Sequence, residues 1–564
     1  MTAFVQWQGK PLTLDEQSFA AGIAQIKKVV GEAFVVTEAA EVHKRAKCII
    51  PEVKKPSAFV YPGSVQEIQE IVKIANEFKL PLWTCSKGKN WGYGSATPVL
   101  EGSLMLVLER MNKIITVDDK LAYAVVEPGV TYRQLHTYLK EQNIRLWLDA
   151  TDGPADGSVI GNALERGVGE TPYGDHFENL CGMEVVLANG ELVRTGGGPM
   201  ENYQSWNTHK WGVGPYLDGL FSQSNYGIVT KAGLWLMPEP EAFLSCIFEL
   251  KNEKDFPAVI DGIRRLQFNG ALRSKIHMIN DVTMFGILSK HPKVLLEGER
   301  WMNDALRAKL RQRYNLPPWL FAGGIYGSVG QVRLAKRLVK RELGRYGRLQ
   351  FIGKPTKEFV QRILPFLKKA HANDRTKRMA EALTLRVCGK PLEFVEMLPH
   401  VYAIEKGEPS DYFVKHAYMK SRRPKPADRD IDPARDDCGG IWAGPMVPLE
   451  GGQVWSIVEM CRDLARKREA DLNIALMVAS GRSVVVLTSL FYDKEDEQET
   501  ANAKELYFEI CNATQQAGYQ QYRTSTMFMP HILAPAPEFQ SLANSIKSAL
   551  DPNNILAPGK YGIG

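Results

Sequence analysis

Several familiar signals are absent from this sequence. Its eight cysteines include no Cys-x-x-Cys pair, so neither a zinc site nor a disulfide framework is indicated. No stretch approaches the roughly eighteen uninterrupted apolar residues of a membrane span, and no basic start followed by an apolar stretch marks a secretory leader. A net charge of +6 over 564 residues is mild and predicts neither nucleic acid nor a membrane as a partner. We expect a cytoplasmic protein with reduced thiols and no metal site.

Length and composition indicate a globular protein with more than one core. A chain of 564 residues is too long for a single core, and its content of 44% hydrophobic and 24% charged residues is ordinary for a folded protein. No internal repeat or low-complexity segment divides the chain. Domain limits must therefore come from changes in local pattern.

Apolar spacing in the first quarter of the chain alternates between helix and strand. Helices are predicted over 12–30, 65–78 and 131–143, and the last two follow the capping-box sequences Ser64–Glu67 and Thr131–Gln134. Buried strands are predicted over 80–85, 104–108 and 122–126. This alternation is typical of an α/β domain.

The pattern changes twice further along the chain. Glycine-rich sequence with short strands, at 183–187, 191–194 and 227–237, continues to about residue 250. Helices then predominate, including basic ones at 303–313 and 331–346, until short apolar and Gly-Pro pieces return after about residue 515. Basic helix faces of this kind are more often solvated than bound to nucleic acid.

One loop is distinguished by its chemistry. Ser86–Pro98 follows an apolar run and contains three glycines together with Lys87 and Lys89. Glycines let backbone N–H groups approach a ligand and lysines add positive charge, which suits a pyrophosphate. The order matches neither G-x-G-x-x-G nor G-x-x-x-x-G-K-[ST], so an ordinary surface turn is the alternative.

Six segments of the chain together are similar to a known protein family. They are Leu146–Asp149, Gly161–Gly169, Thr171–His176, Gly182–Gly190, Gly219–Thr230 and Ala557–Lys560. Together and in this order they closely resemble the vanillyl-alcohol oxidase and p-cresol methylhydroxylase family of flavoproteins. The resemblance implies a two-domain α+β protein with the FAD-binding PCMH-type fold and an inserted cap (substrate) domain, which has an antiparallel sheet and covering helices. It implies an FAD-binding domain at 1–250 and 516–564, and a cap domain at 251–515.

The resemblance also implies an FAD site. Within it, Ser86–Gly94 is the loop that surrounds the FAD pyrophosphate, and Arg523 or Lys560 faces the N1 end of the flavin ring. The residues expected to hold FAD are Ser86, Lys87, Gly88, Lys89, Asn90, Gly92, Ser158, Glu165, Gly167, Val168, Ile228, Val229 and Lys560.

By this resemblance, three residues correspond to positions of the substrate-binding site in this family. Members oxidise para-substituted phenols at the carbon next to the ring, by hydride transfer to flavin and through a quinone methide. The transfer needs a phenolate, whereas a free phenol has a pKa of about 10. Tyr93 and the pair Tyr522 and Arg523 match the family's phenolate cradle, in which a guanidinium and two O–H donors stabilise the anion. Taken singly, each of these residues is more often structural.

Two carboxylates are candidates for the base that resolves the quinone methide. Asp152 stands where the oxidase branch of the family has its active-site aspartate. Glu170 stands where members tend to have a tyrosine facing the substrate. The alternative for both is a solvated carboxylate or an ion pair with Arg166.

The cap departs from the family pattern in three ways. Gly440 and Asp432 stand where a histidine or a tyrosine ties FAD covalently in other members. We therefore expect tight non-covalent FAD, with a bond through Cys438 or Asp432 as the alternative; Cys438 is otherwise an inert core thiol. The apolar run Ser483–Leu487 replaces paired histidines, and the segment Asp152–Ser158 is one residue longer than usual.

Our first hypothesis is that the protein is an FAD-dependent oxidase or hydroxylating dehydrogenase of 4-alkylphenols or 4-(hydroxyalkyl)phenols. One alternative is oxidation of a larger or non-phenolic alcohol in secondary metabolism, and another is a flavin-binding subunit without turnover. The electron acceptor is molecular oxygen or a cytochrome docked on the basic helices, whose faces are otherwise simply solvated. A homodimer is the family expectation.

Overall fold

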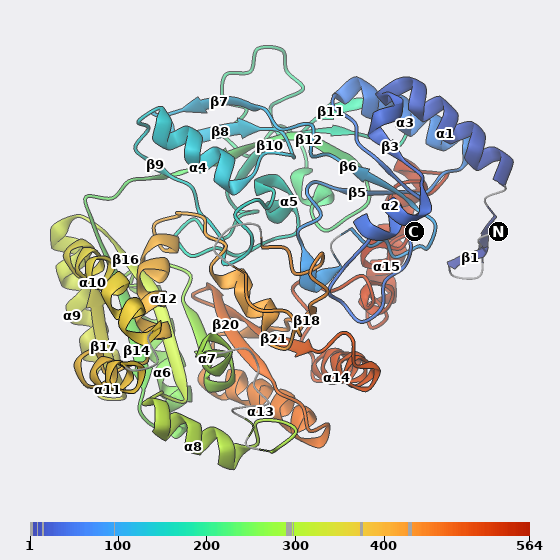
Figure 1. Cartoon of the computed structure of the whole chain (residues 1–564). Coiled ribbons are helices and arrows are strands. Elements are labelled where there is room, and N and C mark those ends of the chain that lie inside the picture. Colours follow the sequence, from blue (N-terminus) through green and yellow to red (C-terminus); the bar gives the residue numbers. More distant parts are fainter. Residues whose placement is uncertain are drawn as a thin grey trace.

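The computed structural model contains an upper body, formed by the N-terminal elements and the last helix, and a lower body formed by the middle of the chain (Figure 1). It describes residues 4–7, 10–13, 16–94, 96–288, 296, 298–372, 376–426 and 431–564. Within these ranges, no helix is long and apolar enough to cross a lipid bilayer.

A four-stranded sheet opens the upper body. Its order is β3 (Val35–Val36), β4 (Ala58–Val60), β6 (Leu104–Val107) and β5 (Leu82–Cys85). β4, β6 and β5 run parallel, and β3 is an antiparallel edge strand. The helices of this part are α1 (Glu16–Val30), α2 (Ala39–Arg45) and α3 (Val65–Phe78). The predicted strands at 80–85 and 104–108 and the helix at 65–78 are thereby confirmed.

Helix starts follow the predicted capping residues, but the capping boxes are incomplete. Ser64 Oγ accepts a hydrogen bond from the backbone N–H of Glu67 at 3.2 Å, and Thr131 does the same for Gln134 at the start of α4 (Tyr132–Glu141). The Glu67 carboxylate, however, accepts from the Gly63 N–H at 2.7 Å. The reciprocal bond predicted for the box at Ser64 is therefore wrong, although the helix boundary is right.

The first predicted helix begins later than its apolar spacing indicated. Residues 10–13 form β2 (Lys10–Thr13), which pairs antiparallel with β1 (Phe4–Trp7), and α1 begins at Glu16. The prediction of helix from residue 12 was therefore wrong, and residues 14 and 15 lie outside the described part. Helical spacing alone cannot reveal that a neighbouring segment offers a strand partner.

A second sheet of the upper body is antiparallel. Its order is β11 (Leu192–Arg194), β10 (Leu180–Val186), β12 (Ile228–Trp235), β8 (Tyr123–Val126) and β7 (Ile114–Asp118). Nearby lie the pair β9 (Leu146–Trp147) and β13 (Met237–Pro238) and the short helix α5 (Val159–Leu164). The α/β alternation therefore holds for the first sheet only, and the whole is α+β.

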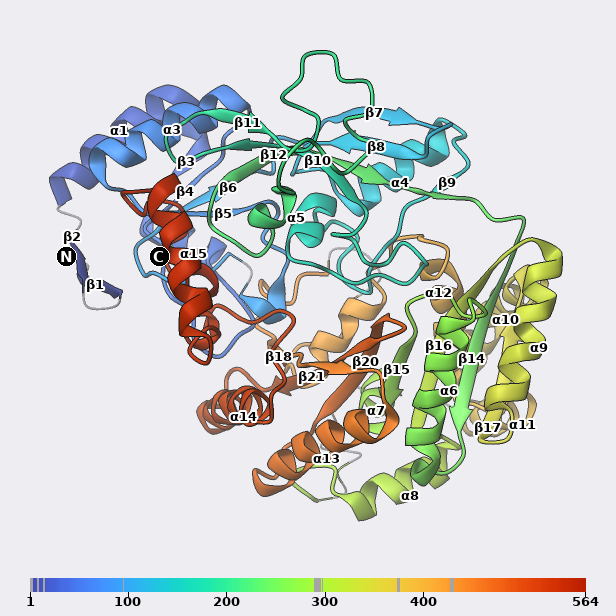
Figure 2. The same ribbon diagram turned by 180° about the vertical axis from the view of Figure 1, so that it is seen from behind.

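The end of the chain rejoins the first sheet. Leu82 N donates to Ile555 O at 2.7 Å and Ala557 N donates to Leu82 O at 2.6 Å, so this segment lies parallel to β5. Figures 1 and 2 show α15 (Pro537–Leu550) beside the N-terminal elements. This return agrees with the pattern change after residue 515, while the limits 1–250, 251–515 and 516–564 stay a prediction.

An eight-stranded antiparallel sheet, called here the cap sheet, organises the lower body. Its order is β17 (Gly347–Ile352), β14 (Ala242–Leu250), β16 (Trp319–Gly327), β15 (His277–Asn280), β20 (Asn473–Ser480), β21 (Ser483–Tyr492) and β18 (Gly439–Ala443), with β19 (Met446–Pro448) also paired to β21. The residue pattern after 250 indicated only helices, whereas the family resemblance implied an antiparallel cap sheet with covering helices, which the structure has. A strand such as β21 is apolar on both faces, and a continuous apolar run does not show a period of two.

Helices cover one face of the cap sheet and its far end. α6 (Phe256–Phe268), α9 (Val329–Leu343) and α13 (Gly451–Lys467) lie against the outer face (Figure 2). The remaining helices are α7 (Asp281–Leu288), α8 (Asp304–Tyr314), α10 (Lys354–Ala372), α11 (Lys377–Cys388), α12 (Leu392–Ile404) and α14 (Glu497–Gln516). The basic helices predicted at 303–313 and 331–346 correspond to α8 and α9.

A buried ion cluster fixes the start of α7. Asp281 is fully buried, and its carboxylate accepts hydrogen bonds from Arg307 at 2.7 Å and from Arg311 at 2.5 Å. Burial raises the pKa of Asp281, but the two guanidinium groups outweigh this effect and hold that pKa below its usual range. The exposed Asp304 also pairs with Arg307, at 2.9 Å.

Asp281→Ala should destabilise the protein by about 3–5 kcal/mol, because it removes the buried counter-ion that Arg307 and Arg311 share. Asp304→Ala removes an exposed partner of the same arginine and should cost less than about 1 kcal/mol. Chemical denaturation of both variants measures the difference. Equal losses of stability would show that burial does not set the strength of this cluster.

Candidate active site

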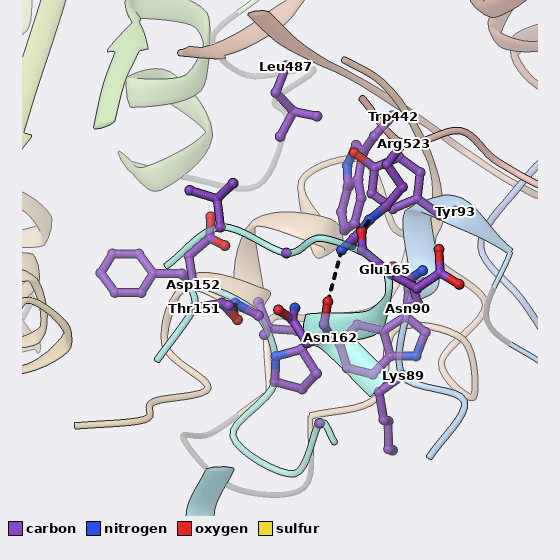
Figure 3. Close-up of a pocket in the computed structure, with 18 of the residues that line it drawn as sticks. Lys89, Asn90, Tyr93, Thr151, Asp152, Asn162, Glu165, Trp442, Leu487 and Arg523 are labelled. Atoms are coloured by element: carbon purple, nitrogen blue, oxygen red, sulfur yellow. Dashed lines mark hydrogen bonds between the residues drawn. The ribbon is translucent and has the colours of Figure 1, made fainter. Parts of the chain in front are cut away.

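A cavity of about 790 Å³ lies between the two bodies, within the size range of ligand sites. We call the cavity wall formed by loops of the upper body the floor. We call the wall formed by the cap sheet of the lower body the roof. Figure 3 shows Tyr93, Trp442 and Arg523 on one side of this space and Thr151 and Asp152 on the other. Residues of both bodies therefore meet around one site.

The roof is the inner face of the cap sheet. Because side chains alternate along a strand, every second residue faces the cavity. The roof residues are Ile247, His277, Ile279, Leu320, Ala322, Trp442, Asn473, Ala475, Met477, Leu487, Ser489 and Phe491. The expected run Ser483–Leu487 lies in β21 and contributes Leu487 to this surface. The roof is mostly apolar and suits an aromatic or aliphatic ligand.

The loop predicted to bind a pyrophosphate lines the cavity with its residues 86–90. Gly88 has a φ of +62°, a conformation that glycine adopts without steric cost. Within the described residues, the backbone N–H groups of Lys87, Lys89 and Asn90 have no acceptor. Unpaired N–H groups beside positive side chains fit the phosphate groups of FAD. Ser95, further along the predicted loop, lies outside the described residues.

Both lysines of the loop are paired with acidic side chains. Lys87 Nζ lies 3.4 Å from Glu109 Oε2, and Lys89 Nζ lies 2.9 Å from Asp432 Oδ2 of the cap. The loop is therefore less electropositive than its sequence suggested. Phosphate binding here rests on backbone N–H groups as much as on the lysines.

Gly92 occupies a different environment from the other predicted cofactor contacts. It is not among the residues that line the cavity. A Cβ atom at this position would lie 2.1 Å from the Trp442 ring of β18. Glycine is therefore required here by the close approach of the cap, and contact with FAD is not needed to explain it.

The remaining predicted cofactor residues all line the cavity. They are Ser158, Glu165, Gly167, Val168, Ile228, Val229 and Lys560. Ser158 caps α5, because its Oγ accepts from Gly161 N at 2.9 Å and donates to Pro128 O at 2.5 Å. At Gly167 a side chain would overlap Asn162. These contacts give the floor a fixed backbone beneath the ligand space.

Glu165 connects the floor to the end of the chain. Its carboxylate accepts from Lys560 Nζ at 2.8 Å and from Tyr561 Oη at 2.6 Å, while its backbone carbonyl accepts from Arg523 Nε at 2.8 Å. Burial raises the pKa of Glu165, but Lys560 and Arg523 outweigh it, so the net pKa is below the usual value. Glu165 is therefore ionised in the neutral range.

Tyr93, Tyr522 and Arg523 come together although 429 residues separate the two tyrosines. Their hydroxyl groups lie 3.4 Å apart. The Arg523 guanidinium carbon lies 5.2 Å from the centre of the Tyr93 ring and 5.6 Å from that of Tyr522. Burial raises the pKa of Tyr93 well above its usual value, so its hydroxyl stays protonated and can donate. The three residues predicted for the phenolate cradle therefore lie together, and their role stays a prediction.

Glu170 and Asp152 lie on the opposite wall. Glu170 is 6% exposed, and its Oε1 lies 3.2 Å from His277 Nδ1. Burial, and then the neighbouring Asp152 and Glu405, raise the pKa of Glu170 well above its usual value. Arg166 instead donates to Ser222 Oγ at 3.0 Å, so the expected alternative of an ion pair with Arg166 is not found for the described residues.

A hydrogen-bond network behind this wall fixes the backbone of Glu170. Asp149 accepts from the N–H groups of Glu170 at 3.1 Å and Thr171 at 2.7 Å, and its Oδ1 lies 3.0 Å from His176 Nε2. His176 Nδ1 in turn lies 2.6 Å from Asn162 Oδ1 on the floor. Two of the recognised segments, Leu146–Asp149 and Thr171–His176, thus position the wall.

His277 is a site residue that the sequence did not indicate. It lies in β15 and faces the cavity, where it contacts Glu170. The strand is only four residues long, with alternating exposure, and offers too little pattern to be recognised. The cap therefore does supply histidines to the cavity: His277 from a strand other than the run Ser483–Leu487, and His416 from the segment Phe413–Tyr418.

Neither candidate for a covalent link to FAD lines the cavity. Cys438 is fully buried among apolar side chains, and burial raises the pKa of its thiol to about 12. Asp432 bonds to Lys89 and accepts from the Arg435 N–H at 3.1 Å. Gly440 lies in β18 against Ile49. The Cys438 thiol is thus enclosed by apolar side chains, and the Asp432 carboxylate is bonded to Lys89 and to a backbone N–H.

Comparison with known proteins agrees with this geometry. A family model described as an FAD binding domain matches residues 56–196. The chain is 33% identical over 550 residues to the 1'-carboxy-chondrochloren decarboxylase of Chondromyces crocatus, covering 97% of this chain and 98% of the relative. It is 29% identical over 557 residues to the 4-cresol dehydrogenase (hydroxylating) flavoprotein subunit of Pseudomonas putida, covering 98% and 97%. The crystal structure of p-cresol methylhydroxylase with substrate bound matches with a TM-score of 0.83 at 29% identity, covering 99% of each chain.

The fold, the cavity and these matches define an FAD-dependent oxidoreductase with a PCMH-type FAD-binding domain. The chain belongs to the vanillyl-alcohol oxidase and p-cresol methylhydroxylase family of flavoproteins. The resemblance stated from the sequence and the two-domain α+β fold with an inserted cap are thereby confirmed. The roles of the individual site residues stay predictions.

Glu165→Gln should lower the unfolding temperature at pH 7, by an amount equivalent to about 1–3 kcal/mol, because it removes charge-assisted hydrogen bonds. The pKa of Glu165 is lowered on folding, so its contribution is present above its ordinary pKa of about 4.3 and is lost as pH falls through the folded value. The difference from wild type should therefore shrink below about pH 4.

Glu109→Gln, which weakens a more exposed pair with Lys87, is the matched control and should change little at either pH. Thermal unfolding between pH 3 and pH 7 measures both variants. A loss at Glu165 that does not depend on pH would contradict the electrostatic explanation.

Proposed function

We propose that the protein oxidises para-substituted phenols at the carbon next to the ring. The observation that supports this most directly is the convergence of Tyr93, Tyr522 and Arg523 at one end of the cavity. A buried guanidinium with two hydroxyl groups is a site for an aromatic oxygen anion. Bound FAD supplies the hydride acceptor.

Arg523 provides the largest stabilisation of such an anion. The guanidinium is always charged, and an opposite charge within a few ångströms lowers a phenol pKa by about one to three units. The two tyrosine hydroxyls add hydrogen bonds to the charged form, which act in the same direction. A phenol with a free pKa of about 10 is thereby brought into the range where much of it is ionised at neutral pH.

The roof positions the rest of the substrate. Ala475, Met477 and Leu487 offer an apolar surface to the aromatic ring and its para substituent. With the phenolate oxygen held near Arg523, the reacting carbon points away from the cradle. We place it near the wall that contains Asp152 and Glu170, the candidates for the group that accepts a proton from the incoming nucleophile.

We also propose that FAD is held without a covalent bond. Cys438 is buried away from the cavity, and Asp432 is committed to Lys89 and to a backbone N–H. Binding then depends on the many backbone and side-chain contacts of the floor. This arrangement agrees with the absence of the family's tethering residues from positions 432 and 440.

Decarboxylation of a larger phenolic acid is a second candidate. The relative with 33% identity is described as a decarboxylase. The cavity also extends into the cap between α7 and α12, where Ile287, Met397, Val401 and Ile404 line it, so a substituent larger than a methyl group can be accommodated. However, the wall at Asp152 and Glu170 offers a carboxylate no cation among the described residues. Benzylic oxidation therefore remains the first candidate.

The electron acceptor and the oligomeric state stay predictions. Oxygen and a cytochrome are both compatible with the family, and a homodimer is expected from it. Part of the basic charge is used within the fold, because Arg307 and Arg311 of α8 bind Asp281. Lys336 and Lys340 of α9 lie over the Phe351 ring and keep their charge, so α9 still presents a basic face to a partner.

Tyr522→Phe and Arg523→Met should slow anaerobic flavin reduction by 4-ethylphenol, by about 10-fold to 1,000-fold for Arg523→Met, because each removes part of the stabilisation of the phenolate. Tyr519→Phe, which alters a half-buried tyrosine three residues upstream bonded to Gln453, is the control and should leave the rate unchanged. Stopped-flow absorbance of the flavin measures all three.

Unchanged rates in the cradle variants would favour a non-phenolic alcohol as substrate. If no 4-alkylphenol bleaches the wild-type flavin, a binding subunit without turnover remains. If only a carboxylated phenol does so, with release of CO₂, the decarboxylase candidate is correct.

Acid precipitation of the holoprotein should leave a colourless pellet and release all FAD into the supernatant, because neither Cys438 nor Asp432 lines the cavity. Absorbance of the two fractions, and flavin fluorescence of the band on a denaturing gel, measure this. A yellow pellet would contradict the proposal. Cys438→Ser and Asp432→Asn would then identify the residue that carries the flavin.

A further inference from the structure

The cavity continues into the cap along one face of α12. Residues Glu393, Met397, Val401 and Ile404 recur every three or four positions, which places them on the same face of this helix, and all of them line the cavity. An α-helix rises about 1.5 Å per residue, so the distance from Ile404 to Glu393 along its axis is about 16 Å. The part of the cavity beside this face, called here the cap channel, is therefore elongated.

The two ends of α12 fix where the cap channel begins and ends. At the C-terminal end, Gly407 N donates to Ile404 O at 2.8 Å, and a Cβ atom on Gly407 would lie 1.6 Å from Leu148 O. Leu148 precedes Asp149, which binds the backbone N–H of Glu170, so this end adjoins the wall of Asp152 and Glu170. Near the other end, the partly exposed Glu396 pairs with Lys368 of α10 at 2.9 Å. The cap channel thus leads from that wall toward the surface of the cap.

Two further segments form the other sides of the cap channel. They are α7 and the segment Phe413–Tyr418, whose lining residues are Thr283, Gly286, Ile287, Phe413, Val414, His416 and Ala417. A Cβ atom on Gly286 would lie 2.4 Å from His416 Nε2, so the glycine lets these two segments pack against each other. The channel is therefore bounded by three elements of the cap.

The lining of the cap channel is mostly apolar and has no net charge. Burial lowers the pKa of His416 to about 3, so its ring is neutral at pH 7. Burial also raises the pKa of Glu405 to about 8, so this carboxyl group is mostly protonated at pH 7. Acidic and basic groups balance among the charged side chains of the described lining, which are Glu393, Glu396, Lys415 and Lys425. Such a lining selects neither an anion nor a cation.

The cap channel does not overlap the expected cofactor site. The residues expected to hold FAD come from the floor, from the loop at 86–92 and from Lys560, and none belongs to α7, α12 or the segment Phe413–Tyr418. FAD bound to the floor therefore leaves the cap channel to the substrate.

We propose that the para substituent of the substrate is an extended, uncharged apolar chain of about eight atoms that occupies the cap channel along α12. This inference rests on the proposed oxidation of para-substituted phenols and names the class of substrate. With the phenolate oxygen held near Arg523 and the reacting carbon near the wall of Asp152 and Glu170, the rest of the substituent continues past Ile404. The apolar part of the helix face, from Ile404 to Met397, is about 10 Å long, and an extended chain advances about 1.2 Å per bond.

Anaerobic flavin reduction by 4-ethylphenol and 4-heptylphenol tests the length of the chain. Stopped-flow absorbance gives, for each phenol, the reduction rate constant divided by Kd. This quotient should be at least about 10-fold higher for 4-heptylphenol in the wild-type holoenzyme, because each buried methylene group contributes about fourfold to binding. Equal quotients, or a lower one for 4-heptylphenol, would overturn the inference.

Variants that narrow the cap channel locate the chain. Val401→Phe and Ile287→Phe add bulk from opposite sides, and each should lower the ratio of the two quotients, 4-heptylphenol over 4-ethylphenol, by at least about 10-fold. Val387→Phe makes the same change as Val401→Phe on α11, where the side chain is 72% exposed, and should leave the ratio as in wild type. The ratio compares two substrates in one protein, so a general loss of activity in a variant does not alter it.

The remaining outcomes separate this inference from the proposed function. An unchanged ratio in both narrowing variants would overturn the inference, and an equal loss for both phenols would make the cap channel an entry route for any substrate. Reduction by 4-ethylphenol but not by 4-heptylphenol would leave the proposed function in place and exclude the long chain. If no 4-alkylphenol of either length reduces the wild-type flavin, the proposed function fails and this inference fails with it.

Discussion

A buried guanidinium without a carboxylate partner is the constraint on which the site depends. Arg523 is 6% exposed, and its hydrogen bonds go to the backbone carbonyls of Glu165 at 2.8 Å and Asn162 at 3.5 Å. Within the described part of the chain it forms no ion pair. Burying a charge in this way costs free energy, which an anion supplied by a ligand recovers. The Glu165 carboxylate compensates only at a distance, because it is turned toward Lys560 and Tyr561. The end of the cavity at Arg523 therefore favours an anionic ligand, because no carboxylate of the described residues pairs with this guanidinium.

The two ends of the cavity therefore differ in charge, and this difference orients a ligand. One end holds Arg523, while the opposite wall holds Asp152, Glu170 and His277, and the apolar roof lies between them. A ligand that is anionic at one end and carries a hydrogen-bond donor, or reacts with one, at the other matches both ends. The reversed orientation would place an anion against acidic groups and leave Arg523 buried without a partner, and each mismatch is worth several kcal/mol in other interfaces. The same electrostatics that favours a phenolate thus determines which part of the substrate faces the flavin and which faces the wall.

What the sequence could predict depended on how local each signal was. Helix starts such as Ser64 were predictable because a capping side chain acts within four residues. β21 could be placed in the cap sheet only through the resemblance, because burial on both faces removes the alternation that marks a strand. Tyr93 and Tyr522 could be joined only through the resemblance, since no local pattern connects residues 429 positions apart. Gly92 and His277 show what remains hidden: the first is glycine because Trp442 approaches it, and the second matters because its strand happens to face the cavity.

The cradle is not a property of the FAD-binding part alone. The chain around Tyr522 bonds to both bodies: its N–H donates to Gly444 O of the cap at 2.9 Å, while its carbonyl accepts from Gln223 of the floor at 2.8 Å. Gly444 N is in turn held by Gln521 Oε1 at 2.6 Å. A shift of the cap relative to the floor therefore moves Tyr522 and Arg523 relative to Tyr93, which belongs to the floor loop. Because hydrogen bonding to an anion depends steeply on distance and angle, such a shift changes the stabilisation of the phenolate before it changes any contact with the reacting carbon. The cap thus acts on the chemistry through the geometry of the cradle as well as through the shape of the roof.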